Sequence, residues 1–200
     1  MAADLKRELT GKHCIVEISW NSRSSETFLE SLTIRQPCLE LASSFEAMRD
    51  AVLRDGENVW TGRTALAHSD IPAFILTLNR RALGHDIPEG WVPESTFWIV
   101  EGDQVVGELE LRHPLNERLR EVGGNIGYLT HPDHRNKGVA AFALRWGLKM
   151  LGKMGVKEAL VTCRDDNAAS IRVIEKCGGV RIEDSKTSGP ARRRYVIPSG

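Results

Sequence analysis

The order in which strands and helices follow one another in the second half of the chain limits its fold more than any other feature. From residue 96 onward, apolar alternation, helical spacing and turn residues predict strand, strand, strand, helix, strand, helix, strand, strand. The strand at 125–130, the helix that follows Gly138 and the strand at 157–163 form one β-α-β unit, which should cross over right-handed. We therefore expect a mixed α/β or α+β protein built around a sheet.

The first half of the chain is predicted to add shorter elements to this sheet. We expect strands at residues 14–20 and 32–36, a helix at 39–53, and a second helix that begins at Asp70. The residues before about 32 fit the sheet poorly. We therefore expect an N-terminal appendage at 1–30 and a single domain at 31–200.

Composition excludes several classes of protein. The 200 residues suit one domain, and 27 basic residues balance 27 acidic ones, so no global field favours nucleic acid or an anionic membrane. No apolar run is long enough to span a bilayer, and the first residues lack the pattern of a secretory signal. The four cysteines are scattered, which argues against a zinc site and against a disulfide framework. We expect a reduced, cytoplasmic protein.

The segment HPDHRNKGVAAFALRW, residues 131–146, places a basic loop of small residues directly before an amphipathic helix. The first amides of a helix have no intrahelical partner and attract anions. Gly138 and Ala140 are small enough for a ligand to approach the backbone, and Arg135 and Lys137 add positive charge. These features predict a phosphate site, but not a Walker loop or a Rossmann fingerprint, whose spacings are absent. A structural turn without a ligand is the plainer alternative.

Two motifs in this region resemble the GNAT superfamily of acyl-CoA-dependent N-acetyltransferases. RNKGVA, residues 135–140, matches the family's R/Q-x-x-G-x-G/A signature, within a longer similarity over residues 124–144. DDNAASIRVIEKCGG, residues 165–179, is similar to the family's later N-x-x-S segment. Residues 87–100 and 110–128 further resemble a poorly characterised branch of predicted acetyltransferases. The resemblance implies a central mixed, largely antiparallel sheet flanked by helices, in which the β-α-β unit holds the cofactor.

The resemblance also implies which residues hold acetyl-CoA. Its pyrophosphate would be bound by the backbone amides of the loop, namely Arg135, Asn136, Lys137, Gly138, Val139 and Ala140. Leu129 and Thr130 would bind the pantetheine arm through their backbone, and Asn167 would contact the arm from the next strand. Asp166 or Asn167 is also expected to cap the helix that follows, and Asn167 could do both.

The reaction of this family makes a base more important than an acid. An amine with a pKa of about 10.4 needs about 4.6 kcal/mol to lose its proton near neutral pH. Many relatives carry a glutamate base on the strand at 125–130 and a tyrosine acid in the last helix, whereas this chain has Asn125 and Ile174 there. An amide cannot accept the proton, but it can hold a water that does.

The candidates for catalysis are His113, Glu110 and Asn125, with Glu108 beside Glu110 and with Tyr128, for which packing is expected more than catalysis. A histidine has a reference pKa of about 6.5, which suits a general base, although packing at a strand end is the plainer role for His113. Glu108 and Glu110 alternate along one strand and point to the same face. They would attract a cationic acceptor if this face lines the site, or pair with Arg or Lys if the face is solvated.

The resemblance thus predicts transfer of an acetyl group from acetyl-CoA to a primary amine by direct attack in a ternary complex. A non-catalytic domain that binds acyl-CoA is the alternative, which Asn125 and Ile174 favour, and a phosphate or nucleotide binder that shares only the loop is a third reading. The acceptor, a small molecule or a peptide amine, stays open. We expect no metal, nucleic-acid or membrane partner, and a homodimer would fit the family.

Overall fold

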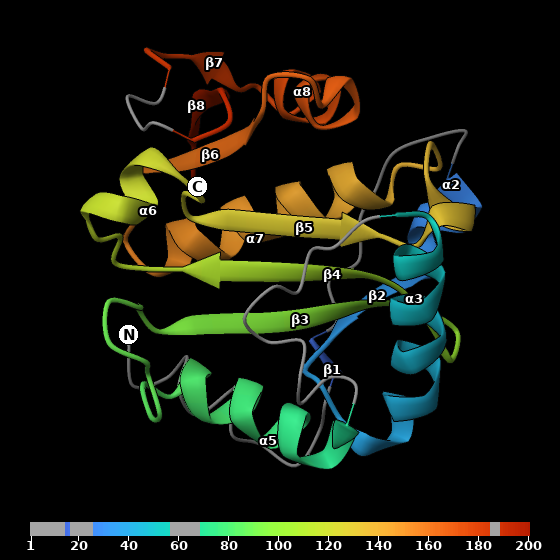
Figure 1. Ribbon diagram of the computed structural model, residues 1–200. Coiled ribbons are helices and arrows are strands. Elements are labelled where there is room, and N and C mark those ends of the chain that lie inside the picture. Colours follow the sequence, from blue (N-terminus) through green and yellow to red (C-terminus); the bar gives the residue numbers. More distant parts are fainter. Residues whose placement is uncertain (1–14, 17–25, 57–68, 185–188) are drawn as a thin grey trace.

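The computed structural model describes residues 15–16, 26–56, 69–184 and 189–200 (Figure 1). Its strands are β1 (Ile15–Val16), β2 (Leu32–Arg35), β3 (Glu94–Glu101), β4 (Gln104–Arg112), β5 (Ile126–Thr130), β6 (Glu158–Arg164), β7 (Val180–Arg181) and β8 (Arg192–Pro198). Its helices are α2 (Glu26–Glu30), α3 (Ala42–Arg54), α5 (Ile71–Ala82), α6 (Glu117–Glu121), α7 (Val139–Lys153) and α8 (Ala168–Lys176), with short 3-10 helices η1 (Leu39–Leu41) and η2 (Pro132–His134). The elements expected after residue 96 all occur in the predicted order, while α6 and η2 were not predicted.

The larger sheet has five strands in the order β1-β2-β3-β4-β5, and every neighbouring pair is antiparallel. β3 and β4 form a hairpin, in which Glu94 pairs with Arg112 and Glu101 pairs with Gln104. β3 is buried along almost its whole length. Its apolar run covers only residues 97–100, and the buried start of the strand is polar, with Glu94, Ser95 and Thr96.

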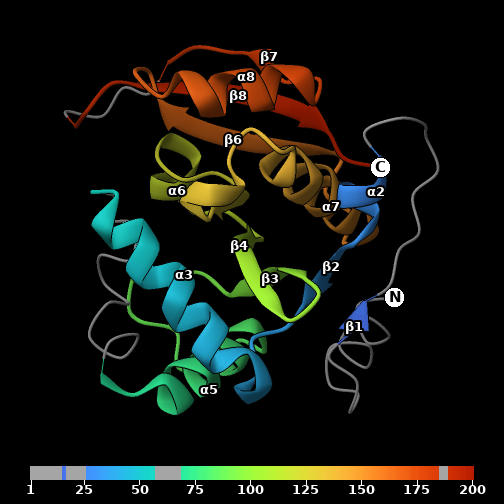
Figure 2. The same ribbon diagram turned by 90° about the vertical axis from the view of Figure 1, so that its right-hand side faces the viewer.

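Helices cover both faces of this sheet, and each face has its own apolar core. On one face α7 packs against β4 and β5, around residues such as Leu109 and Leu144. On the other face α3 and α5 pack against β4 and β3, where the rings of Phe45 and Trp98 stack with centroids 4.7 Å apart. Figure 2 shows this layered arrangement, with α3 and α5 to the left of and below the strands of the sheet and α7 to their upper right.

The last strands form a separate antiparallel sheet in the order β6-β8-β7. The expected β5-α7-β6 unit connects the two sheets, and α8 packs against α7 and β6. The sheets meet where Gly124 bridges to Val161 and where Asn125 N–H donates to Leu160 O at 2.7 Å, and β5 and β6 diverge from there (Figure 1). The fold is the expected α/β class with flanking helices, but the expected central sheet is divided in two.

Part of the expected N-terminal appendage packs on the domain. β1 extends the larger sheet by pairing with β2, and α2 lies directly before β2. The strand predicted at 14–20 is described only at Ile15–Val16, because residue 14 and residues 17–20 lie outside the described residues. A division of the chain at residue 30 stays a prediction.

The helices of the first half follow the predicted pattern with one refinement. The helix expected at 39–53 begins as η1 and continues as α3. α5 begins directly after Asp70, as predicted, and the Asp70 side chain accepts a hydrogen bond from Ala73 N at 2.9 Å. In the ranges described above, no helix is both long and apolar enough to cross a bilayer.

Candidate active site

The loop between β5 and α7 contains the residues expected to bind a pyrophosphate. After η2 the backbone takes positive φ at Asn136, with 61°, and again at Gly138, with 90°. Gly138 is the N-cap of α7 and supplies the left-handed conformation that residues with a Cβ rarely adopt. This turn lets the helix begin at Val139, immediately after the basic loop.

α7 begins without a side-chain cap, in contrast to three other helices. Asp70, Asn116 and Asn167 each accept a hydrogen bond from an amide in the first turn of α5, α6 and α8. Gly138 has no side chain that could make this bond. Its N-cap thus leaves the first amides of α7 uncapped, and a helix start with unpaired amides favours an anion.

Two basic side chains lie beside this helix start. Arg135 Nη1 donates to Asp55 Oδ2 at 2.5 Å, and Asp55 follows directly after α3. Lys137 is exposed, with its Nζ 6.0 Å from the ring centroid of Phe28. Lys137 adds positive potential at the helix start, whereas the charge of Arg135 is partly offset by Asp55. Asp55 could not be expected from the sequence, because it contacts a residue 80 positions away.

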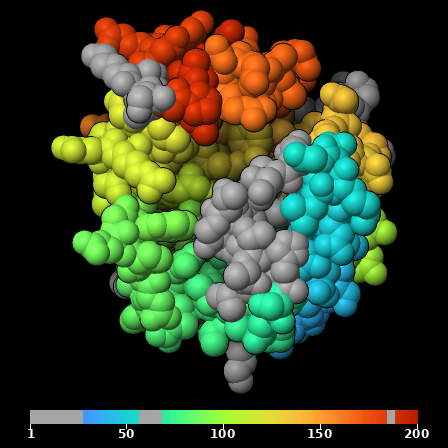
Figure 3. All heavy atoms as spheres, viewed as in Figure 1, coloured from blue at the N-terminus to red at the C-terminus, as the bar shows by residue number. Residues whose placement is uncertain are grey.

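Leu129 and Thr130 lie at the end of β5 that leads into the loop, as expected. Leu129 packs partly against the core under α3 and α5. Thr130 Oγ1 is buried and finds no hydrogen-bond partner among the residues that the structure describes. A buried polar atom without a partner costs about 1–3 kcal/mol, so this position suits a ligand that supplies the missing bond. Figure 3 shows the molecular surface hollowed between α6, α3 and α8, the part of the molecule where β5 lies.

Asn167 caps α8, which confirms the structural role predicted for it. Its Oδ1 accepts from Ser170 N at 2.9 Å. In the same helix, Ile174 is fully buried in the core under α7. The position at which many relatives carry a tyrosine is therefore packed with an apolar side chain here, and contact between Asn167 and the cofactor stays a prediction.

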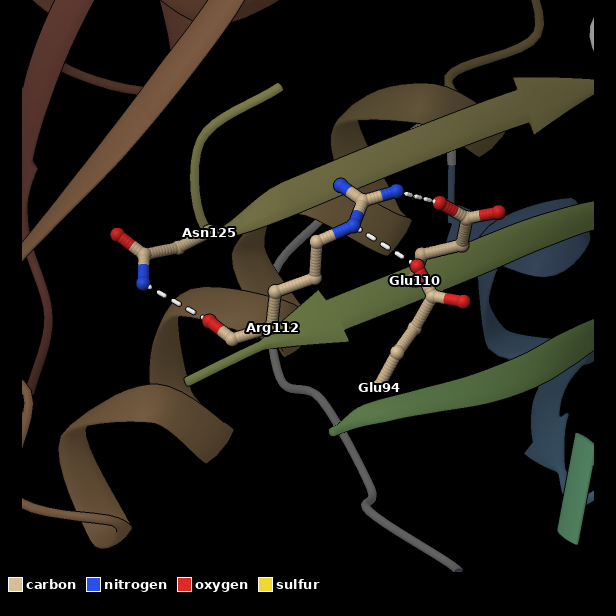
Figure 4. A network of polar contacts seen from close by, with 4 residues as sticks. All are labelled: Glu94, Glu110, Arg112 and Asn125. Atoms are coloured by element: carbon tan, nitrogen blue, oxygen red, sulfur yellow. Dashed lines mark hydrogen bonds and ion pairs between the residues drawn. The ribbon is translucent and has the colours of Figure 1, made fainter. Parts of the chain in front are cut away.

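An ion-pair network lies on the face of the larger sheet opposite α7. Arg112 Nε donates to Glu94 Oε2 at 2.8 Å, and Arg112 Nη2 donates to Glu110 Oε2 (Figure 4). A Cβ at Gly127 would lie 3.1 Å from Glu110 Oε2, so the network extends over β5. The side chains of Glu94 and Glu110 are only 5% and 19% exposed.

Of the two alternatives for this face, the structure argues against the solvated one, and the role as a wall of the active site stays a prediction. Glu110 pairs with an arginine of its own strand, and Glu108 is 3% exposed, so the face is not solvated. α3 and α5 pack on this side of the sheet. Glu94 and Arg112 were not among the expected residues; the register of the β3–β4 hairpin, which pairs them, was the signal that could have found them.

Asn125 occupies the junction of the two sheets. Its Nδ2 donates to Arg112 O at 2.9 Å, and its Oδ1 accepts from Leu160 N at 2.8 Å. The residue is 5% exposed, so both bonds are made out of water. The side chain therefore joins β4, β5 and β6, which is a positioning role.

His113 follows β4 directly and is half-buried. Burial lowers the pKa of His113 from its ordinary value of 6.5. Within the described ranges its ring makes no hydrogen bond to another residue. A neutral imidazole without a partner can accept a proton near neutral pH.

Tyr128 is held in its neutral form on the α7 side of β5. Burial raises the pKa of Tyr128 to about 12, and its hydroxyl donates to Ser170 O at 3.5 Å. This supports the packing role over a catalytic one.

The histidines near the loop make local contacts instead of a metal site. His134 Nε2 lies 3.3 Å from Glu101 Oε2, and His131 Nδ1 accepts from Asp133 N at 3.1 Å. The described part of the chain contains no group of three or more His, Cys, Asp or Glu side chains arranged to hold a metal ion.

Comparisons with known proteins support one family. Residues 32–180 match the acetyltransferase (GNAT) domain. No curated protein gave a significant match. Among solved structures, the microcin C7 self-immunity acetyltransferase MccE, determined with acetyl-CoA and AMP, is similar with a TM-score of 0.63 and 16% identity, over 84% of this chain and 92% of MccE.

Two further structures are similar to this fold. RimJ of Mycobacterium smegmatis, in complex with CoA-disulfide, has a TM-score of 0.62 and 20% identity, over 84% of this chain and 82% of RimJ. YncA of Salmonella typhimurium, a putative acetyltransferase with its cofactor acetyl-CoA, has a TM-score of 0.58 and 16% identity, over 85% of this chain and 95% of YncA. The family match covers most of the chain and includes the uncapped start of α7, so the chain belongs to the GNAT family of acetyltransferases.

Proposed function

We propose that this GNAT acetyltransferase moves an acetyl group from acetyl-CoA to a primary amine, which attacks the thioester directly while both molecules are bound. The observation that carries the proposal is the start of α7. There Gly138 leaves the first amides without a side-chain cap, beside Arg135 and Lys137. A pyrophosphate is the kind of anion that such a helix start binds.

The residues of this chain fit acetyl-CoA in the following way. The pyrophosphate would be held by the backbone amides of the loop residues Arg135, Asn136, Lys137, Gly138, Val139 and Ala140. The open edge of β5 at Leu129 and Thr130 would bind the pantetheine arm, and the buried Thr130 hydroxyl would gain a partner. Asn167 would contact the arm through the amide nitrogen that its helix cap does not use.

Direct attack is preferred to a covalent acyl-enzyme because the described cysteines are poor nucleophiles. Burial raises the pKa of the Cys163 thiol and of the Cys177 thiol, so both stay protonated near neutral pH. Cys38 is also buried, within the core under α3 and α5. The fourth cysteine, Cys14, lies outside the described residues.

His113 is the proposed general base. Its lowered pKa keeps the imidazole neutral, so its nitrogen can take the proton that the acceptor amine must lose. Asn125 would act indirectly, because its hydrogen bonds connect β4, the strand that precedes His113, to β5 and β6. The amide thus positions the base in place of holding a catalytic water.

Glu110 is proposed to bind the acceptor instead of serving as the base. Its carboxylate is engaged with Arg112 on the buried face between α6 and α3. A carboxylate can accept several hydrogen bonds at once, so the same group can receive a cationic amine before it is deprotonated. Glu110→Gln should raise the KM of the amine and leave acetyl-CoA binding unchanged.

The test of the cofactor site is isothermal titration of the protein with acetyl-CoA. The wild type should bind, and an Arg135→Glu, Gly138→Glu double variant should lose at least about a hundredfold in affinity, because it removes one positive charge and adds two negative ones at the helix start. Lys149→Glu reverses an exposed charge on the same helix, away from the loop, and should bind like the wild type. A folded wild type that does not bind acetyl-CoA contradicts the proposal.

A domain that binds acetyl-CoA without turnover is the second candidate, and Asn125 and Ile174 favour it. The two functions are separated by measuring release of free CoA thiol with a panel of primary amines. Thiol release that depends on one class of amine supports the enzyme. Binding of acetyl-CoA without thiol release for any amine supports the binding domain.

A further inference from the structure

Helix α2 packs against the outside of the loop that precedes α7. A Cβ built on Gly138 would lie 3.2 Å from Leu29 Cδ2 and 3.5 Å from Leu29 Cδ1. The left-handed turn at Gly138 is therefore closed on one side by an apolar side chain from the N-terminal segment. A leucine in this place limits how far the turn can move outward.

The neighbouring side chain of α2 makes two contacts with the same loop. The ring of Phe28 stacks on the ring of His134, with centroids 6.4 Å apart and an interplanar angle of 25°. Lys137 Nζ lies 6.0 Å from the centroid of the Phe28 ring. Phe28 thus contacts residues on both sides of Arg135, and Leu29 contacts the glycine at the helix start.

α2 is itself anchored to the larger sheet. Ser31 N–H donates to Phe28 O at 3.2 Å, and Ser31 Oγ donates to the same carbonyl at 2.7 Å. The next residue, Leu32, begins β2 and belongs to the core under α7. Figure 2 shows α2 beside α7, on the side toward β2, whereas β6 and α8 lie beyond α7. The helix is therefore held by the same core that supports the loop.

We propose that α2 is a positioning element of the cofactor site, so that residues before the GNAT domain set the affinity of the protein for the pyrophosphate of its donor. The GNAT match begins at residue 32, and α2 lies before it. Groups that bind an anion must be held within about 0.5 Å of their productive positions, and packing from outside supplies this restraint. The inference rests on the proposed function, because it presumes that the loop holds a pyrophosphate.

The experiment compares two acetyl donors in Leu29→Ala and Phe28→Ala. Acetyl-CoA carries the pyrophosphate, whereas S-acetylpantetheine carries the same thioester and arm without it. The dissociation constant of acetyl-CoA should rise roughly tenfold in each variant, because the loop amides lose their restraint. The value of kcat/KM for S-acetylpantetheine should stay within about twofold of the wild type, because this donor makes no contact with the loop.

Glu30→Ala is the matched control, since Glu30 lies on the same helix and is exposed; it should leave both donors unchanged. Leu29→Val, a smaller change, gives the same readout if Leu29→Ala does not fold. Equal losses with both donors, or no loss with acetyl-CoA, would overturn the inference and leave the proposed function intact. A folded wild type that binds no acetyl-CoA would instead overturn the proposed function, and the inference with it.

Discussion

At the scale of single residues, Asn125 joins three strands because an amide carries both a donor and an acceptor. Its nitrogen satisfies Arg112 O, and its oxygen satisfies Leu160 N. An ionised glutamate in this place would have only acceptors and could not bond a carbonyl. The asparagine therefore has a structural role here, and under the proposed function the base would be another residue.

We expect the acid limb of the pH profile of kcat/KM to belong to His113. Burial lowers the pKa of His113 below its ordinary 6.5, so the neutral, basic form persists to lower pH than in an exposed histidine. Activity should be retained above this lowered pKa and fall as the pH drops through it. His113→Gln should remove the limb and lower kcat about a hundredfold.

His131 is a control for this measurement, because burial also lowers its pKa, with a smaller contribution from His134. His131→Gln should keep the acid limb of the profile. A limb that survives in His113→Gln and disappears in His131→Gln would assign the titration to the loop and contradict the proposed base.

At the scale of secondary structure, α7 and α8 differ in whether a side chain caps the unpaired amides of their first turn. Both helices expose amides in their first turn. At α8 the Asn167 side chain satisfies one of them, and at α7 Gly138 leaves them open. The difference separates a helix start that its own N-cap side chain completes from one that the proposed pyrophosphate would complete.

Asn167→Asp tests whether Asn167 serves the cofactor as well as the helix. The carboxylate keeps the acceptor that caps α8, so the free energy of unfolding should change by less than about 0.5 kcal/mol. The substitution removes the amide donor, so the affinity for acetyl-CoA should fall several-fold in calorimetry.

Asp70→Asn makes the reverse exchange at the cap of α5 and should leave acetyl-CoA binding unchanged. Unchanged affinity in Asn167→Asp as well would limit Asn167 to its role as a cap.

At the scale of the whole molecule, the two sheets are held together over a very short junction. Gly124 bridges to Val161 with a φ of 67°, and a Cβ there would lie 2.3 Å from Leu160 O. The strands can then diverge beyond the junction, so β5 pairs with β4 on one edge and its other edge has no strand neighbour in the described part of the chain. That edge is where the proposed donor site lies.

Gly124→Ala should therefore destabilise the protein by about 3 kcal/mol or more, because the new methyl group collides with backbone atoms that cannot move aside. Gly155 also has a positive φ, 86°, but nothing lies within 4 Å of its added Cβ. Gly155→Ala should cost only about 1 kcal/mol, from the backbone conformation alone. Urea denaturation of the two variants measures the difference, and equal losses would show that the close approach at the junction is unimportant.

The order of strands and helices after residue 96, the caps at Asp70 and Asn167 and the loop before α7 could all be predicted from the sequence. These features depend on periodicity, capping and turn residues, whose physical effects act over a few neighbouring positions. Residues 26–30 and 117–121 form helices too short to show a period, and they were missed.

Only the tertiary structure decided the contacts that complete the site. It divided the sheet at Asn125, placed Arg112 between Glu94 and Glu110, and set Leu29 against Gly138. Most of these contacts join segments that are far apart along the chain, such as the 35 positions between Asn125 and Leu160, although Arg112 and Glu110 lie on one strand. Local sequence patterns do not predict such pairs, because the geometry of each pair depends on how the packed layers bring distant strands and helices together.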